Sequence, residues 1–374
     1  MDAISVLIVD DSALMRNLIG RIVESTPGLA VAGKAMNGSF AIDKIPLVKP
    51  DVIVLDIEMP VMNGVEFLKE RKKRGIDIPV IILSSIAREG ASVTMECLAL
   101  GASDFITKPS GSDSADISKV AHRLAELLLL FGGQYAKTHQ KKIELRDPAA
   151  PLILPSASPS PVRAALAVKK PAGPVVPLRE GGKIEIIAIG ISTGGPNALR
   201  EVFAKIDPSV SQPIVVVQHM PAGFTEEFAK SLNTICPLEV KEAKEGDLLK
   251  KGRILIAPGN KHMTVEQRTL ASIVHLSDAE QCNGHRPSVD VLFESVAKQY
   301  QNRALGVIMT GMGKDGAVQL AEMRKQGSYT LGQDEETSIV YGMPKVAFEY
   351  GGVQKQVPLS AMAAEISSLA LKHS

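Results

Sequence analysis

Three residues that together could activate a serine lie far apart in this chain of 374 residues. Ser192 fits G-x-S-x-G at residues 190–194, a turn that lifts a serine hydroxyl above the end of a strand. His219 could take the proton of that serine near neutral pH, and Asp315 could fix the tautomer of the histidine. The set predicts nucleophilic attack on an acyl group.

Each of these residues follows an apolar run that is typical of a strand buried on both faces, at 186–189, 213–218 and 304–309. Alternating helical stretches indicate a parallel sheet, whose strands bring their carboxyl ends to one edge, where ligands bind. We therefore expect Ser192, His219 and Asp315 to converge, with the N–H groups of Thr193 and Met312 facing an oxyanion. Taken singly, the serine fits a structural or phosphate-binding loop, the histidine a core position and the aspartate a helix N-cap.

A second polar set follows the strands expected in the N-terminal third of the chain. Apolar runs there end at Asp10-Asp11, Asp56, Ser84 and Lys108. Converging carboxylates repel one another unless a cation binds them, and hard oxygen ligands suit Mg²⁺. A carboxylate beside Mg²⁺ is a nucleophile toward a phosphoryl group, and the lysine would neutralise the resulting charge. Each aspartate alone also fits a turn or a helix cap.

Residues 3–128 resemble the receiver domains of bacterial response regulators, in Asp10-Asp11, Leu55-Asp56-Ile57-Glu58-Met59-Pro60, Asn63-Gly64, Ser84 and Lys108-Pro109. The resemblance implies that Asp56 accepts a phosphoryl group from a chemotaxis histidine kinase. It implies that Mg²⁺ is held by Asp11, the Asp56 carboxylate and the Glu58 carbonyl, with Asp10 acting through water. It also implies a switch formed by Ser84, Phe105 and Lys108.

Residues 183–374 resemble the chemotaxis protein-glutamate methylesterases, in residues 189–196, 218–221, 257–259, 262–263, 286–290 and 310–316. The resemblance implies that Ser192, His219 and Asp315 form a catalytic triad without a cofactor. It implies hydrolysis of glutamate γ-methyl esters, and deamidation of glutamines, on the cytoplasmic domains of methyl-accepting chemoreceptors. Arg286 is expected to attract their acidic segments. Ile191 departs from the alanine that is commoner in the family.

We expect an α/β protein with two doubly wound parallel-sheet domains. Residues 1–131 would form the receiver domain, flavodoxin-like in its fold, with its last helix ending at Gly132-Gly133. Residues 132–182 would be a flexible Pro/Ala-rich linker, with eight prolines and no acidic residue between 148 and 177. Residues 183–374 would form the Rossmann-like methylesterase domain.

The net charge, the cysteine spacing and the lengths of the apolar runs limit which partners and locations the protein can have. A net charge of +1 argues against a nucleic-acid or membrane-surface protein. The three cysteines have no metal-site spacing, and neither a signal peptide nor a membrane-spanning run is evident, which predicts a cytoplasmic protein. Two rival functions are a receiver coupled to a nucleotide-binding domain and a DNA-binding response regulator. The first lacks the phosphate-loop lysine, and the second lacks a basic recognition helix.

Overall fold

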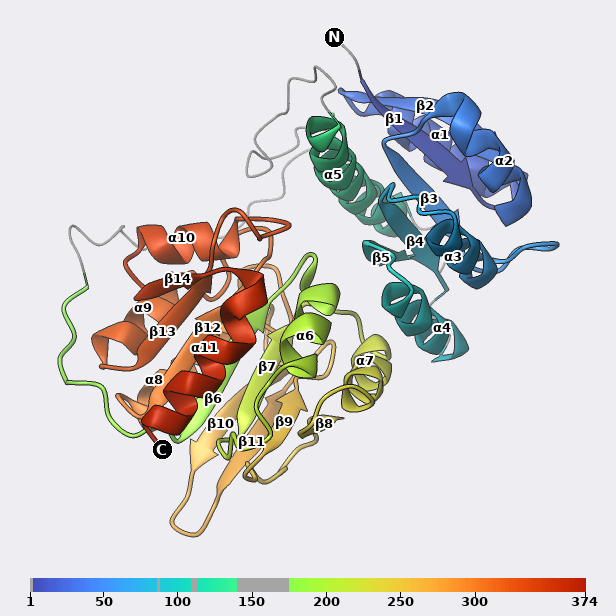
Figure 1. Cartoon of the computed structure of the whole chain (residues 1–374). Helices are drawn as coiled ribbons and strands as arrows, with labels where there is room; N and C mark the ends of the chain where they lie inside the picture. Colours follow the sequence, from blue (N-terminus) through green and yellow to red (C-terminus); the bar gives the residue numbers. More distant parts are fainter. Residues whose placement is uncertain (1–2, 86–87, 109–113, 140–174) are drawn as a thin grey trace. The chain divides into compact units, whose positions relative to one another are not determined.

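The computed structural model describes residues 3–85, 88–108, 114–139 and 175–374. The chain divides into two compact units, Met1–Val162 and Arg163–Ser374, and each contains a parallel sheet covered by helices (Figure 1). The predicted α/β class with two doubly wound parallel sheets is confirmed. The predicted proline-rich tether falls mostly on residues 140–174, which lie outside the described residues.

The first unit has a five-stranded sheet in the order β2-β1-β3-β4-β5, and every pairing is parallel. Its elements are β1 (Ile4–Val9), α1 (Ala13–Ser25), β2 (Leu29–Ala35), α2 (Gly38–Val48), β3 (Val52–Asp56), α3 (Gly64–Lys73), β4 (Val80–Ser84), α4 (Arg88–Ala99), β5 (Asp104–Thr107) and α5 (Ser114–Thr138). The chain adds β2 on one side of β1 and then adds β3, β4 and β5 on the other side. The carboxyl ends of these two strands therefore adjoin at a switch point.

The prediction that the last helix of the first domain ends at Gly132-Gly133 is wrong. Helix α5 continues through both glycines and ends at Thr138. The glycine is needed for packing and does not end the helix. A Cβ on Gly132 would lie 2.4 Å from Ile4 Cγ2 and 3.1 Å from Val52 Cγ1. The missing side chain thus lets the helix lie directly against β1 and β3, although glycine inside a helix costs roughly 1 kcal/mol relative to alanine.

The second unit has a seven-stranded parallel sheet in the order β14-β13-β12-β6-β7-β9-β8, with an antiparallel β10-β11 pair beside it. Its strands are β6 (Ile186–Ile191), β7 (Ile214–Gln218), β8 (Glu239–Glu242), β9 (Arg253–Ile256), β10 (His262–Gln267), β11 (Ser272–Ser277), β12 (Ala304–Ile308), β13 (Tyr329–Gln333) and β14 (Lys355–Val357). Its helices are α6 (Gly195–Ala204), α7 (Phe224–Asn233), α8 (Val289–Tyr300), α9 (Ala317–Lys325), α10 (Met343–Glu349) and α11 (Leu359–Lys372).

The order of this sheet fixes the place of its switch point. The central strand β6 pairs with β7 on one side and with β12 on the other. All residues of these three strands are buried, as their apolar composition predicts. Helices α6, α7 and α11 pack together on one face, and α8, α9 and α10 on the other (Figure 1).

The end of the predicted linker belongs to the second unit. The N–H of Leu178 donates to the carbonyl of Lys325 over 2.7 Å, and the N–H of Gly182 donates to that of Asn302 over 3.0 Å. A Cβ on Gly181 would meet the ring of Tyr329 at 2.5 Å. Residues 178–182 therefore pack on the second unit, whereas the predicted linker extends to residue 182.

Candidate active site

Ser192, His219 and Asp315 meet at the carboxyl ends of adjacent strands. They follow β6, β7 and β12, as the sequence predicted. The Ser192 Oγ lies 3.1 Å from His219 Nδ1, and His219 Nε2 lies 2.9 Å from Asp315 Oδ2. The Nε2–H therefore donates to the carboxylate and leaves the Nδ1 lone pair for the serine proton. This orientation reverses that of the serine proteases, in which Nε2 faces the serine.

The turn at Ser192 depends on close backbone approaches. The N–H of Ser192 donates to the Thr310 carbonyl over 2.9 Å, which ties the end of β6 to the end of β12. Gly194 has a φ of 74°, in the left-handed region, and precedes the first residue of α6. A Cβ on Gly195 would lie 2.0 Å from Gln218 Oε1. The glycines thus let Ser192 stand immediately before the first turn of α6.

The predicted oxyanion donors lie beside the serine. Thr193 follows it directly and is buried. A Cβ on Gly311 would lie 2.8 Å from Ser192 Cβ, so the loop that carries Met312 passes immediately next to the nucleophile. This proximity supports a role for both backbone N–H groups.

The Asp315 carboxylate lies at the N-terminus of α8 and does not cap α9, the helix that follows it in sequence. It accepts hydrogen bonds from the backbone N–H of Val289 at 2.6 Å and of Asp290 at 3.2 Å, and from the Ser288 hydroxyl at 2.7 Å. Burial alone would raise its pKa, but the hydrogen bonds and charge of His219 and the other donors hold that pKa well below its usual range. Asp315 is therefore ionised where it faces the histidine.

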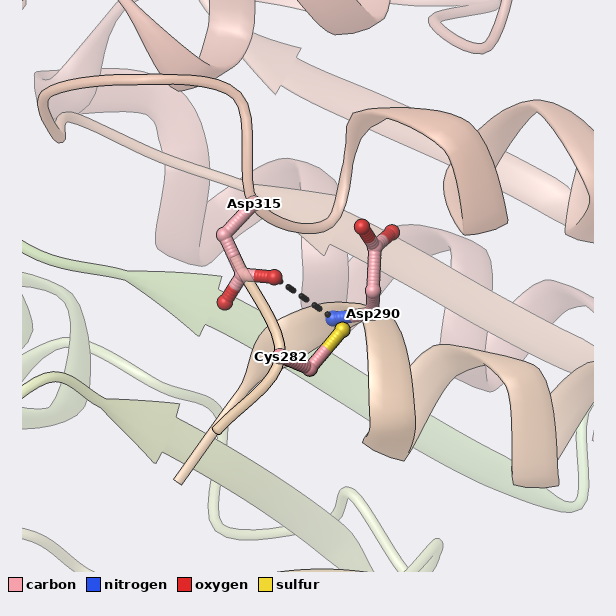
Figure 2. A group of neighbouring side chains, drawn as sticks. All are labelled: Cys282, Asp290 and Asp315. Atoms are coloured by element: carbon pink, nitrogen blue, oxygen red, sulfur yellow. Dashed lines mark hydrogen bonds between the residues drawn. The ribbon is translucent and has the colours of Figure 1, made fainter. Parts of the chain in front are cut away.

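Asp290 and Cys282 lie next to Asp315, each with an acceptor or thiol atom within 4.8 Å of the others (Figure 2). Burial, and then the charge of Asp315, raise the pKa of Asp290 to about 6. Burial also raises the pKa of the Cys282 thiol. The carboxylate oxygens already accept hydrogen bonds from this chain, so the group forms a hydrogen-bonded network and offers a poor cation site.

In the first unit, Asp10, Asp11 and Asp56 come together at the carboxyl ends of β1 and β3, with ligand atoms within 4.8 Å of one another. The Lys108 ammonium lies 2.8 Å from Asp56 Oδ2 and 3.5 Å from Asp10 Oδ2. Burial, and then repulsion by Asp56, raise the pKa of Asp10, whose Oδ2 is buried without a hydrogen bond. An unsatisfied oxygen among three carboxylates fits a bound cation.

Two predicted switch residues lie on β4 and β5, the two strands that follow β3 in the sheet. Ser84 ends β4 and is fully buried, with its Oγ 2.6 Å from the Thr94 hydroxyl of α4. Phe105 is half-buried on β5. The side chain of Glu58 is exposed, in keeping with a role for its backbone carbonyl only.

Sequence reasoning assigned no role to Asn283, Ser288 and Asp290, which contact Asp315. It also assigned none to His285, whose ring stacks on that of His219. The Asn-Gly pair at 283–284 is a strong signal for a tight hairpin and could have drawn attention to this segment. The steering role expected for Arg286 loses support. Its guanidinium donates to Asn260 Oδ1 and to the carbonyls of Asp278 and Ala279.

Known protein families match both units of the chain. The CheB methylesterase family matches residues 187–366, and the response regulator receiver domain family matches residues 6–119. The protein-glutamate methylesterase/protein-glutamine glutaminase of Treponema denticola is 62% identical over 373 residues, covering 98% of both chains. Its counterpart in Treponema pallidum is 54% identical over 388 residues, covering 97% of this chain and 96% of that protein.

A solved structure, the CheB methylesterase catalytic domain of Thermotoga maritima, shares 36% identity with this chain. It has a TM-score of 0.49 and covers 50% of this chain and 99% of its own. Among the described residues, no helix is both long and apolar enough to cross a membrane. The two family matches and the near full-length relatives argue against both rival functions, a nucleotide-binding domain and a DNA-binding response regulator. The chain belongs to the receiver-linked protein-glutamate methylesterase/protein-glutamine glutaminase (CheB) family.

Proposed function

We propose that Ser192, His219 and Asp315 hydrolyse glutamate γ-methyl esters, and the amides of specific glutamines, on methyl-accepting chemoreceptors. The observation that carries the proposal is the hydrogen-bonded series from Ser192 Oγ through the His219 ring to Asp315. It lies at the switch point of a doubly wound sheet, where this fold class binds ligands. Removal of the methyl groups would reset receptor signalling during sensory adaptation.

In the first half of the reaction, Ser192 Oγ attacks the ester carbonyl carbon and its proton passes to His219 Nδ1. The negative charge on the carbonyl oxygen is stabilised by the N–H groups of Thr193 and Met312. Asp315 stabilises the imidazolium through Nε2–H. Collapse of the tetrahedral intermediate breaks the C–O bond, and methanol leaves with the proton from the histidine.

In the second half, a water molecule attacks the acyl-serine while His219 Nδ1 accepts its proton. Collapse breaks the bond to Ser192 Oγ, which takes the proton back, and free glutamate remains on the receptor. With a glutamine substrate the same steps release ammonia instead of methanol. The same residues therefore account for both activities named for the family.

The receiver unit would control this activity within a two-component system. Asp56 accepts the phosphoryl group from a chemotaxis histidine kinase, and Lys108 lies close enough to pair with the product. Asp10, Asp11, Asp56 and the Glu58 carbonyl would hold Mg²⁺, which neutralises charge during phosphoryl transfer. Ser84 and Phe105 would respond to the new phosphoryl group. A cytoplasmic location follows from the kinase and the cytoplasmic receptor domains that we propose as partners.

Methanol release from methylated receptor membranes tests the proposal. Ser192→Ala should abolish release, and His219→Ala should lower it by roughly a thousandfold or more because triad members act as a unit. Ser209→Ala, at an exposed serine of the same unit, is the matched control and should keep full activity. A fluorophosphonate probe should label the control but not Ser192→Ala. Near wild-type turnover by Ser192→Ala would overturn the assignment of the nucleophile.

A further inference from the structure

We propose that Asn283 is a positioning residue of this esterase, whose side-chain amide bridges Asp315 to Asp290 and so holds the triad carboxylate against His219. The inference rests on the proposed function and goes beyond it, because it adds a residue and a second carboxylate to the machinery. Asn283 acts through Asp315 and touches neither the nucleophile nor the reacting atoms.

The bridge starts from a very short hairpin. Cys282 and His285 exchange both backbone hydrogen bonds, at 3.1 and 2.9 Å, which leaves only Asn283 and Gly284 in the turn. Their φ values are 54° and 80°. Positive φ at both central residues defines the type I′ turn, for which Asn-Gly is the preferred pair. The turn conformation therefore fixes where the Asn283 side chain starts.

The amide nitrogen of Asn283 donates to two carboxylates at once. Its Nδ2 lies 2.7 Å from Asp290 Oδ2 and 2.8 Å from Asp315 Oδ1. An amide has two N–H donors, so this geometry gives one to each oxygen. Carboxylates this close repel each other, here one buried and one half-buried, and a shared donor offsets the repulsion. The bridge lets both groups remain ionised without moving apart.

Asp290 anchors the other end of the bridge. It occupies the first turn of α8, and its Oδ1 accepts the backbone N–H of Gln319 in α9 at 3.1 Å. The amide thus links the hairpin to two helices and to Asp315. Movement of Asp315 away from His219 would have to break this link as well as its own hydrogen bonds.

The same hairpin holds the histidine. The ring of His285 lies parallel to the ring of His219, with centroids 3.8 Å apart and planes 12° apart. One arm of the hairpin therefore restrains His219, and the turn restrains the carboxylate that orients it. This arrangement explains why a surface turn of two residues would matter to the chemistry.

Asn283→Gly in the full-length chain is the sharpest variant, because glycine keeps the positive φ of the turn and removes only the side chain. Asn283 is exposed, so no cavity is created. We expect kcat for methanol release to fall roughly tenfold to a hundredfold with KM little changed, the range for losing a hydrogen bond to a charged group. Labelling of Ser192 by a fluorophosphonate probe should slow in parallel, while the thermal midpoint stays close to that of the wild type.

Gln281→Gly, at an exposed neighbour in the same segment, is the matched control and should change neither kcat nor labelling. In an Asp290→Asn background, Asn283→Gly should cost several-fold less, because only one charge then needs the donor. An unchanged kcat in Asn283→Gly, or an equal loss in both backgrounds, would overturn the bridge. Activity that survives Ser192→Ala would instead overturn the triad, so the two failures are distinguishable.

Discussion

At the scale of single residues, the site is defined by how the imidazole of His219 is held. Its Nδ1 faces Ser192 and its Nε2 faces Asp315, so the proposed base would act through the nitrogen nearer its own backbone. The hydrogen bonds fix two points of the ring, and the stacked ring of His285 restricts its tilt. Precise orientation matters because small misplacements of catalytic groups reduce rates strongly.

Two replacements of His285 distinguish the effect of its ring stacking on His219 from the effect of its polar nitrogen atoms. His285→Ala should lower kcat by roughly twofold to tenfold, the effect of losing an aromatic contact of about 0.5–1.5 kcal/mol. His285→Phe keeps a flat ring against His219 and should retain most of the activity. Steady-state methanol release measures both variants. Equal losses in the two would show that the polar atoms of His285 matter and not its stacking.

The raised pKa of Asp290 predicts a pH dependence of stability. Its pKa is about 6 in the folded chain against 3.8 for an ordinary aspartate, so the folded state holds this proton more tightly. Its contribution to stability is therefore present below about pH 4 and is lost as the pH rises through about 6. Asp290→Asn should gain stability over the wild type across that window, by up to roughly 3 kcal/mol.

Denaturant midpoints at about pH 4.5 and about pH 7 measure this difference, and linear extrapolation converts them to free energies. The lowered pKa of Asp315 acts in the opposite direction, since its contribution is lost as the pH falls. The contribution of Asp315 is present in both the wild type and Asp290→Asn, so it largely cancels when their stabilities are compared. A difference that is the same at both pH values would contradict the raised pKa.

The sequence was sufficient to predict that Ser192, His219 and Asp315 converge, because each lies at or past the end of an apolar run and the ends of parallel strands meet at one edge of the sheet. It could not reveal the partners of Asp315, which come from the hairpin at 282–285 and from the start of α8. These contacts depend on how a loop folds over the end of the sheet. Local spacing carries no information on such a contact until the tertiary fold is known.

At the scale of elements, the site depends on the close approach of β6 and α8. A Cβ on Gly190 would lie 2.2 Å from Val289 Cγ1, so the missing side chain lets the start of α8 reach the sheet. That position brings the Val289 N–H to Asp315. The glycine pattern around Ser192 thus serves helix packing as well as the turn, a role that the motif alone does not show.

Gly190→Ala should push α8 away from β6. We expect a loss of about 1–3 kcal/mol in unfolding free energy, typical of overpacking, together with a lower kcat. Gly306→Ala in β12 is the matched control. Its Cβ would meet the flexible ends of Leu320 and Met323, which can move, so kcat should fall less. Equal effects on kcat would show that contact between β6 and α8 does not position Asp315.

At the scale of the whole chain, phosphorylation in one unit has to change catalysis in the other. Asp56→Asn should remove phosphorylation by acyl phosphates with Mg²⁺, because the acceptor carboxylate is lost. Intact mass measurement before and after treatment detects the added phosphate. Asp77→Asn, at an exposed aspartate of the same unit, should still be phosphorylated in full. Phosphate found on the Asp56→Asn chain would disprove the assignment of the acceptor.

The presence of both units in one chain favours inhibition by the resting receiver on energetic grounds. Two units in one chain meet at a high effective concentration, in the millimolar range for a short flexible linker and lower for a long one. A weak contact over the Ser192 site would then suffice to exclude a bulky receptor helix. A coupling free energy of about 1–3 kcal/mol changes activity from several-fold to a hundredfold.

We therefore expect residues 175–374 alone to release methanol faster than the unphosphorylated full-length chain. The fragment begins at 175 because Leu178 and Gly182 bond to the catalytic unit, so a start at 183 would remove part of its packing. Acyl phosphate with Mg²⁺ should activate the full-length chain, leave the fragment unchanged and fail to activate Asp56→Asn. A fragment no faster than the resting chain would exclude occlusion. Phosphorylation would then have to act by raising the activity of the triad or by recruiting the enzyme to its receptors.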